Sequence, residues 1–126
     1  MKNSIIVPDD VSHLPEPHEM AVARLLSAYF KKDVTFIKRA YSKTADIKIG
    51  HTEWEIKSPT GSGKHNIQHK LQEAAKQSKN VVLDASRSKI HQKRFTAEAK
   101  HQFTIVRSIK RMIIIEKSKN IVDISR

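Results

Sequence analysis

The stretch Asp46-Ile-Lys-Ile-Gly-His-Thr-Glu-Trp-Glu-Ile-Lys57 has the pattern of a β-hairpin, and it decides how the rest of the chain is placed. Two short alternating runs flank Gly50-His51, and glycine at the first central position suits a tight two-residue turn. Counting outward from this turn places Asp46 opposite Glu55. The sequence therefore predicts that two antiparallel strands bring these two acids together.

Asp46 and Glu55 form an unfavourable pair for a plain sheet. Directly opposed side chains lie about 5 Å apart at Cβ, where like charges repel, and a divalent cation between the carboxylates would relieve this repulsion. Lys57 lies two residues beyond Glu55 and so on the same strand face. This convergence is typical of a metal-dependent site that cleaves phosphodiesters. The alternative is an antiparallel sheet with one solvated face, on which charges are ordinary.

Length and composition indicate one folded domain. The 126 residues suit a single domain over 1–126, with residues 1–15 as an arm or a short strand. Cysteine is absent, which excludes a disulfide framework, a thiolate zinc site and a cysteine nucleophile. No apolar run approaches the roughly 20 residues that a membrane span needs, and the N-terminal apolar run is too short for a signal peptide.

The charge of the chain indicates a polyanionic partner. Lys and Arg number 24 against 13 acids, a formal net charge of +11. A field of this sign favours nucleic acid first, and an anionic membrane or acidic protein next. We predict that the basic side chains contacting nucleic acid include Lys64, Lys70, Arg87 and Arg94. Taken singly, each basic pair is also consistent with a solvated surface.

Hydrophobic periodicity and turn residues predict the remaining elements. The expected order is a helix from Pro17 to Phe30, strands near 34–40, 44–49 and 53–58, a helix over 67–78, a strand over 80–84, a helix over 88–106, and strands over 112–116 and 120–124. Helices would pack on a central mixed β-sheet, which defines an α/β or α+β fold.

Two charged residues are expected on the apolar faces of these helices. Glu19 falls on the stripe that includes Val22 and Leu26, so it is either a partly exposed acid of the first turn or a carboxylate aimed inward at the hairpin site. In the third helix, Arg94 is expected toward the core together with Phe95.

The loop Ser58-Pro-Thr-Gly-Ser-Gly-Lys64 follows the second hairpin strand. A Walker A loop needs Gly at position 58 and Ser or Thr at 65, where Ser58 and His65 stand, so nucleoside triphosphate binding is not expected. A flexible basic loop beside the hairpin site could still hold a substrate backbone.

Asp46, followed by Glu55-x-Lys57 on the next strand and set between helices, resembles the PD-(D/E)XK nuclease superfamily, with Ala45 where the name has proline. The longer string of Trp54-Glu-Ile-Lys-Ser-Pro, Asn66-Ile-Gln68, Gln77-Ser78 and Asn80-Val-Val-Leu-Asp84 resembles the C-terminal toxin domains of contact-dependent growth inhibition proteins of the CdiA type that are tRNA nucleases.

The resemblance implies a role for each matching residue. Glu19 would be the first-helix acid, Asp46 and Glu55 the metal ligands, and Lys57 the catalytic lysine, while Gln68 would help to shape the site. The implied cofactor is Mg²⁺, or another divalent cation such as Mn²⁺ or Zn²⁺.

We therefore expect a metal-dependent endonuclease, with a toxin that cleaves tRNA favoured. The alternatives are a DNA endonuclease of the restriction or repair type on the same fold, and a non-catalytic basic protein that binds nucleic acid. The resemblance also implies an immunity protein as partner, and action in the cytoplasm of a target cell after delivery as part of a larger toxin.

Overall fold

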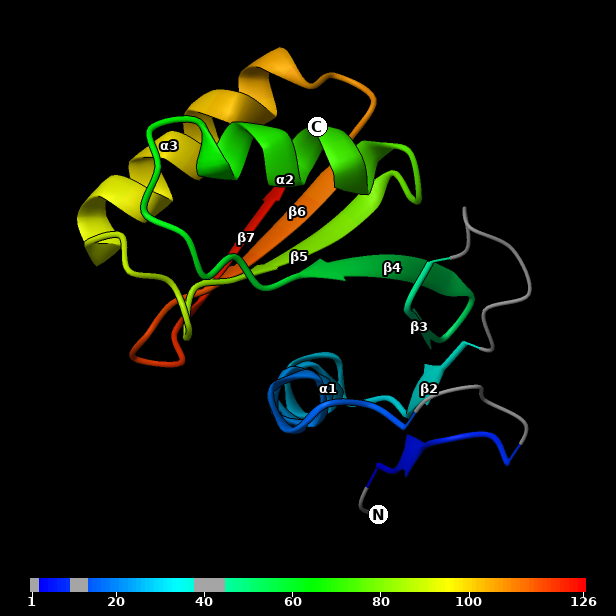
Figure 1. Ribbon diagram of the computed structural model, residues 1–126. Coiled ribbons are helices and arrows are strands. Elements are labelled where there is room, and N and C mark those ends of the chain that lie inside the picture. Colours follow the sequence, from blue (N-terminus) through cyan, green and yellow to red (C-terminus); the bar gives the residue numbers. More distant parts are fainter. Residues whose placement is uncertain (1–2, 10–13, 38–44) are drawn as a thin grey trace.

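The computed structural model describes residues 3–9, 14–37 and 45–126, and its strands form one sheet (Figure 1). The elements are β1 (Ile5–Ile6), α1 (Pro17–Phe30), β2 (Val34–Phe36), β3 (Ile47–Ile49), β4 (Thr52–Lys57), α2 (Asn66–Ala75), β5 (Asn80–Asp84), α3 (Gln92–Ile105), β6 (Arg111–Ile115) and β7 (Ile121–Ser125). The strands of this seven-stranded sheet lie in chain order. The predicted α/β architecture with a central mixed sheet is confirmed.

The connections explain why the sheet is mixed. β1 and β2, β4 and β5, and β5 and β6 are parallel pairs, and a helix joins the two strands of each. β2, β3 and β4 are joined in antiparallel order, as are β6 and β7. Helices α2 and α3 lie together over one face, and α1 lies on the other side (Figure 1). The sheet is therefore covered on both faces where β5 and β6 run.

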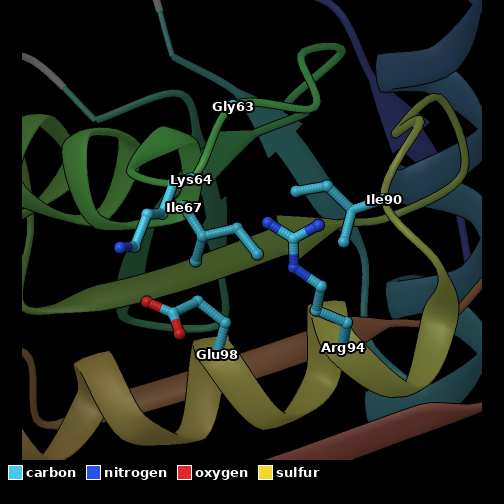
Figure 2. Close-up of a pocket in the computed structure, with 6 residues that line it drawn as sticks. All are labelled: Gly63, Lys64, Ile67, Ile90, Arg94 and Glu98. Carbon is cyan, nitrogen blue, oxygen red and sulfur yellow. The ribbon is translucent and has the colours of Figure 1, made fainter.

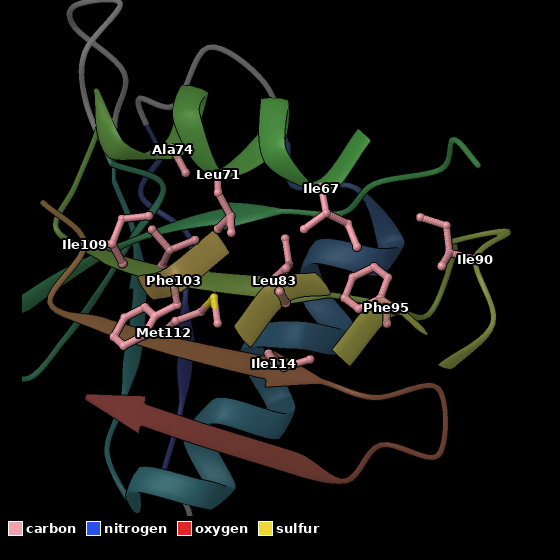
Figure 3. Packing of buried hydrophobic residues seen from close by; sticks show 13 residues of the cluster. Ile67, Leu71, Ala74, Leu83, Ile90, Phe95, Phe103, Ile109, Met112 and Ile114 are labelled. Atoms are coloured by element: carbon pink, nitrogen blue, oxygen red, sulfur yellow. The ribbon is translucent and has the colours of Figure 1, made fainter. Parts of the chain in front are cut away.

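Each face of the sheet has its own apolar core. Val81 and Leu83 of β5 pack under α2 and α3, whereas Val82 between them packs toward α1. Burial on both faces explains why β5 and β6 read as almost continuous apolar runs. Figure 3 shows the core beneath α2 and α3, where Ile67, Phe95 and their neighbours meet.

The hairpin has the predicted register. Ile47 pairs with Trp54, and Ile49 pairs with Thr52 across the turn. Gly50 has a φ of 61°, the left-handed conformation that glycine adopts without steric cost. The alternation also matches, because Ile47 and Ile49 are buried toward α1 while Lys48 between them is exposed.

The third helix differs from its prediction. It begins at Gln92 rather than near 88, because a turn stands before it in which the N–H of Ser88 donates to the carbonyl of Ala85. The predicted core position of Arg94 is wrong, since this side chain is exposed. The buried stripe passes through Phe95 and the positions four and eight residues beyond it, and Arg94 lies just off that stripe.

Other differences concern the ends of elements. β2 stops at Phe36, and the rest of the strand predicted near 34–40, with the start of the next, lies outside the described residues. α2 ends at Ala75 rather than 78, and β6 and β7 are each displaced by one residue from the predicted ranges. Residues 1–15 include β1, which pairs with β2.

An ion pair joins the last two strands to α1 and to the hairpin. Arg111 on β6 donates through Nε and Nη2 to both carboxylate oxygens of Asp123 on β7, at 3.0 and 2.6 Å. Its guanidinium also lies 5.1 Å from the ring centre of Phe30 and 5.4 Å from that of Trp54. Tyr29 donates its hydroxyl to Asp123 at 2.8 Å. These contacts connect α1 to β4, β6 and β7.

We expect Gly50→Ala to destabilise the domain by about 1 kcal/mol, because a side chain strains the left-handed backbone. A Cβ at this position would also meet Nζ of Lys32 at 3.3 Å. Thermal unfolding followed by circular dichroism should show Tm lowered by about 4 °C.

Gly63→Ala is the matched control. The φ of Gly63 is not positive, and a Cβ there meets nothing within 4 Å. This variant should be neutral or slightly stabilising, because alanine reduces the freedom of the unfolded chain. An equal loss in both variants would contradict the assigned turn.

The Arg111–Asp123 pair should make stability depend on pH. Hydrogen bonds donated by Arg111 hold the pKa of the Asp123 carboxyl below its ordinary value. A depressed folded-state pKa stabilises the protein above the unfolded pKa of about 3.9, and this contribution is lost as pH falls through the folded value. Asp123→Asn should therefore cost about 1 kcal/mol at pH 7, since the pair is partly exposed, and less as the pH falls below the unfolded pKa.

Urea unfolding of wild type and Asp123→Asn at pH 7 and pH 3 measures this difference. Glu53→Gln, which changes an exposed side chain of β4, is the control and should show no such pH dependence. A cost for Asp123→Asn that is the same at both pH values would exclude the carboxylate charge as its cause.

Candidate active site

Asp46 lies just before β3 and turns its side chain against β4. Its N–H donates to the carbonyl of Trp54 at 3.0 Å, and its Oδ2 accepts from the N–H of Ile56 at 2.8 Å. The residue is 6% exposed. The carboxylate thus takes the place of a backbone acceptor where the β3–β4 ladder ends, which fixes Asp46 beside the strand that carries Glu55.

Glu55 and Lys57 lie together on the face that α2 covers. Glu55 is 3% exposed, and it aligns with Val81, which packs beneath α2 and α3. Nζ of Lys57 lies 3.5 Å from Oε2 of Glu55. The structure thus brings the predicted lysine to Glu55 at the edge of an apolar core. Asp46 lies just before the adjoining strand β3 and is held to the backbone of Ile56, the residue after Glu55.

Glu73 is a member of this cluster that the sequence did not single out. Its Oε2 lies 3.4 Å from Nζ of Lys57 and 3.7 Å from Nζ of Lys70. It is the one acidic residue of α2 (Asn66–Ala75), on an otherwise basic and amide-rich surface. A single acid among basic and amide side chains is the one feature of the sequence that could have drawn attention to Glu73. The neighbouring residues in the sequence do not show which strand its side chain reaches.

Glu19 has a clear role in its own helix. Its Oε1 accepts from the N–H of Glu16 at 2.9 Å, which completes a capping box with the side chain of Glu16. The residue is half-buried. This geometry matches the first of the two interpretations, an acid of the first helical turn. Its role as a carboxylate of the active site remains a prediction.

Gln68 lies in the first turn of α2, where its Oε1 is 3.1 Å from Nδ1 of His65. His65 precedes α2 and is exposed. The contact places Gln68 at the end of the loop that leaves β4. Its role in shaping the site remains a prediction.

The four predicted nucleic-acid contacts divide into separate places. Lys64 and Arg94 line one cavity of about 440 Å³, which Figure 2 shows. Lys70 pairs with Glu73, and the guanidinium of Arg87 lies 3.2 Å from the ring nitrogens of His18 on α1. The cavity is thus lined by two of the four predicted basic contacts.

Asp84 is a third buried carboxylate near the ends of β4 and β5. It is 1% exposed, and it accepts from Oγ of Ser58 at 3.2 Å and from the N–H and Oγ of Ser86 at 3.0 Å each. Neutral donors therefore satisfy both of its oxygens. This arrangement ties the start of the loop after β4 to the end of β5, and so positions the loop beside the site.

The donors at Asp46 and Glu55 fit a hard cation. Magnesium is usually held by one or two carboxylates, with water and substrate phosphate oxygens as its other ligands. Across 3–9, 14–37 and 45–126, no group of three or more His, Cys, Asp or Glu side chains is placed to hold a metal ion. An ion at this pair would accordingly keep positions open for substrate oxygens.

Sequence comparison identifies the family. A model of the contact-dependent growth inhibition CdiA C-terminal domain matches residues 43–121, more than half of the chain and the part that contains the hairpin and the cluster around Lys57. The chain therefore belongs to this family, which confirms the resemblance to CdiA-type domains. No curated protein matches the chain.

Structural comparison shows the same fold in a known toxin. The fold matches the toxin–immunity complex CdiA-CT/CdiI from Burkholderia pseudomallei with a TM-score of 0.60, over 98% of this chain and 100% of that chain. The sequences are 16% identical, so the likeness establishes the shared architecture. None of the helices in the described parts of the chain is long and apolar enough to cross a membrane.

We expect Asp46→Ala to cost about 1–3 kcal/mol of stability, because it removes the acceptor of the buried Ile56 N–H. Asp46→Asn retains an oxygen at this position and should cost less than Asp46→Ala. Urea unfolding of both variants beside wild type measures the difference. If the alanine variant is as stable as wild type, the carboxylate does not anchor the end of the β3–β4 ladder.

Proposed function

We propose that this domain is a metal-dependent endonuclease of the PD-(D/E)XK type, with tRNA as its favoured substrate. The observation that carries the proposal is the position of Lys57, whose Nζ lies 3.5 Å from Oε2 of the buried Glu55, with the buried Asp46 bonded to the backbone of Ile56 on the same strand. Burying carboxylates is costly unless charge and hydrogen bonds compensate them. A site that recruits a cation and a phosphate accounts for this arrangement.

Each residue has a role that suits its chemistry. Asp46 and Glu55 would hold Mg²⁺, or another divalent cation such as Mn²⁺ or Zn²⁺. When bound, the ion polarises the scissile phosphate and lowers the pKa of a bound water. Lys57 orients the attacking water or stabilises the negative charge that grows on the phosphate oxygens.

The second contact of Lys57 suits an amine that changes partners. The side chain of Glu73 is 52% exposed, so its attraction for Lys57 is screened by solvent. A phosphate that enters the site can therefore replace Glu73 as the partner of Nζ at little cost. Glu55 is buried and keeps the amine in position while this happens.

The surroundings support a nucleic-acid substrate. A net charge of +11 favours association with a polyanion. The preference for tRNA over DNA rests on the resemblance to CdiA-type tRNA nucleases. The structural relative is a toxin in complex with an immunity protein, and we propose such a partner here, with delivery as part of a larger toxin and action in the cytoplasm of the target cell.

The test is incubation of the purified domain with total tRNA, total RNA and plasmid DNA, in Mg²⁺ and in EDTA. We expect discrete tRNA fragments in Mg²⁺ and none in EDTA. Glu55→Gln should abolish cleavage by loss of the metal site, and Lys57→Ala should reduce the rate at least about 100-fold by loss of transition-state stabilisation. Gel electrophoresis of the labelled products measures both effects.

Glu53→Gln is the control, because it removes an exposed carboxylate of the same strand and should leave cleavage intact. Cleavage of plasmid and not of tRNA would favour the DNA endonuclease. Salt-sensitive binding without cleavage, unchanged in Glu55→Gln and Lys57→Ala, would leave a non-catalytic nucleic-acid-binding domain.

A further inference from the structure

The cavity of about 440 Å³ lies between the loop after β4, α2 and α3 (Figure 2). Its lining residues come from these three segments and the turn before α3: Gly63, Lys64, Ile67, Ile90, Arg94 and Glu98. Its volume is in the range of pockets that take small ligands, and its wall combines apolar and charged groups as such pockets do. None of the roles proposed above explains this combination.

Arg94 is one of two cations that line the cavity, the other being Lys64. Figure 2 shows its guanidinium directed into the cavity between Ile67 and Ile90. The side chain of Arg94 has no hydrogen-bond or ion-pair partner among the described residues. A guanidinium offers several N–H donors in a planar fork, the geometry that suits phosphate oxygens.

The other charged side chains make the two sides of the cavity electrostatically different. In Figure 2 the carboxylate of Glu98 and the amine of Lys64 extend toward the same side, away from Arg94. Glu98 also accepts from Nε2 of Gln102 at 3.1 Å, which holds its carboxylate in place. The carboxylate of Glu98 offsets the positive charge of Lys64 on that side of the cavity, so a phosphate is expected beside Arg94.

The apolar wall is rigid. Ile67 and Ile90 belong to the core between the sheet, α2 and α3, and are 1% and 4% exposed (Figure 3). Each therefore offers the cavity almost no accessible surface. The two isoleucines fix the shape of the cavity, and its charged groups supply the contacts to a ligand.

The cavity is close to the candidate active site. The loop that contributes Gly63 and Lys64 follows directly after Lys57. Along α2, Ile67 lies six residues before Glu73, which is about 9 Å at 1.5 Å per residue. Glu73 in turn contacts Lys57. A strand of nucleic acid with one phosphate at Lys57 can therefore reach the cavity with a neighbouring nucleotide.

We propose that this cavity binds one nucleotide of the substrate strand beside the cut, with its phosphate on Arg94. The identity of the ligand rests on the proposed nuclease function. The predicted consequence is a subsite that accepts a 5′-nucleoside monophosphate by itself, more tightly than a nucleoside, which lacks the phosphate.

The test is a ¹H–¹⁵N NMR titration of the domain with AMP, CMP, GMP and UMP in EDTA, beside adenosine and inorganic phosphate. We expect the nucleotides to shift the amides of Gly63, Lys64, Ile90 and Arg94. Arg94→Gln should weaken this binding at least fivefold, while Lys100→Gln, an exposed site further along α3, should leave it unchanged. Both changes are at exposed positions, so the spectra also show whether the fold is retained.

Two results would overturn the inference: no nucleotide shifts the cavity amides, or Arg94→Gln binds as wild type does. The readout does not need cleavage, so the two proposals fail separately. If nucleotides bind at the cavity but no nucleic acid is cut, the subsite stands and the nuclease proposal fails. If tRNA is cut with the same KM by wild type and Arg94→Gln, the nuclease stands and the subsite fails.

Discussion

The hydrogen bond from the N–H of Ile56 to the carboxylate of Asp46 determines where the acids of the candidate active site lie. It closes the β3–β4 ladder at the point where β3 begins, and it fixes an acid beside the strand of Glu55. The same strand then passes under α2 and pairs with β5. The acids are thus held by the edge of the core, and a rigid core is what keeps charged groups at fixed separations.

Position at the edge of the core also explains how charge can gather here. Glu55 aligns with residues that pack beneath α2 and α3, so it is almost fully removed from water. Lys57, two residues on, keeps a side chain that is 21% exposed. Charges interact more strongly where water is excluded, yet the amine can still meet a ligand from solvent. Deeper burial would strengthen the interaction between the charges, but it would make the amine of Lys57 inaccessible to a ligand.

The sequence predicted the parts of the fold that local rules determine. Gly50 and the period of two set the hairpin register, and the apolar run of β5 marked an internal strand. Arg94 was misplaced because it lies four residues after the buried Ile90, and Ile90 belongs to the turn before α3 rather than to the helix, so the helical spacing does not apply between them. Glu73 was missed because its position depends on how α2 packs over β4, and no local pattern carries that information. Residues joined by tertiary packing therefore had to come from the structure.

The loop from Ser58 to Lys64 connects the candidate active site to the cavity. It begins at the hydrogen bond between Ser58 and the buried Asp84, directly after Lys57, and it ends at the wall of the cavity that Arg94 faces. One end is therefore anchored to the sheet, and the other leads into α2. Because the anchor is buried and neutral donors satisfy it, the loop has a fixed origin beside the cluster of Glu55, Lys57 and Glu73. A short connection of this kind keeps the two sites at a constant separation, as an extended polymer substrate requires if it is to contact both at once.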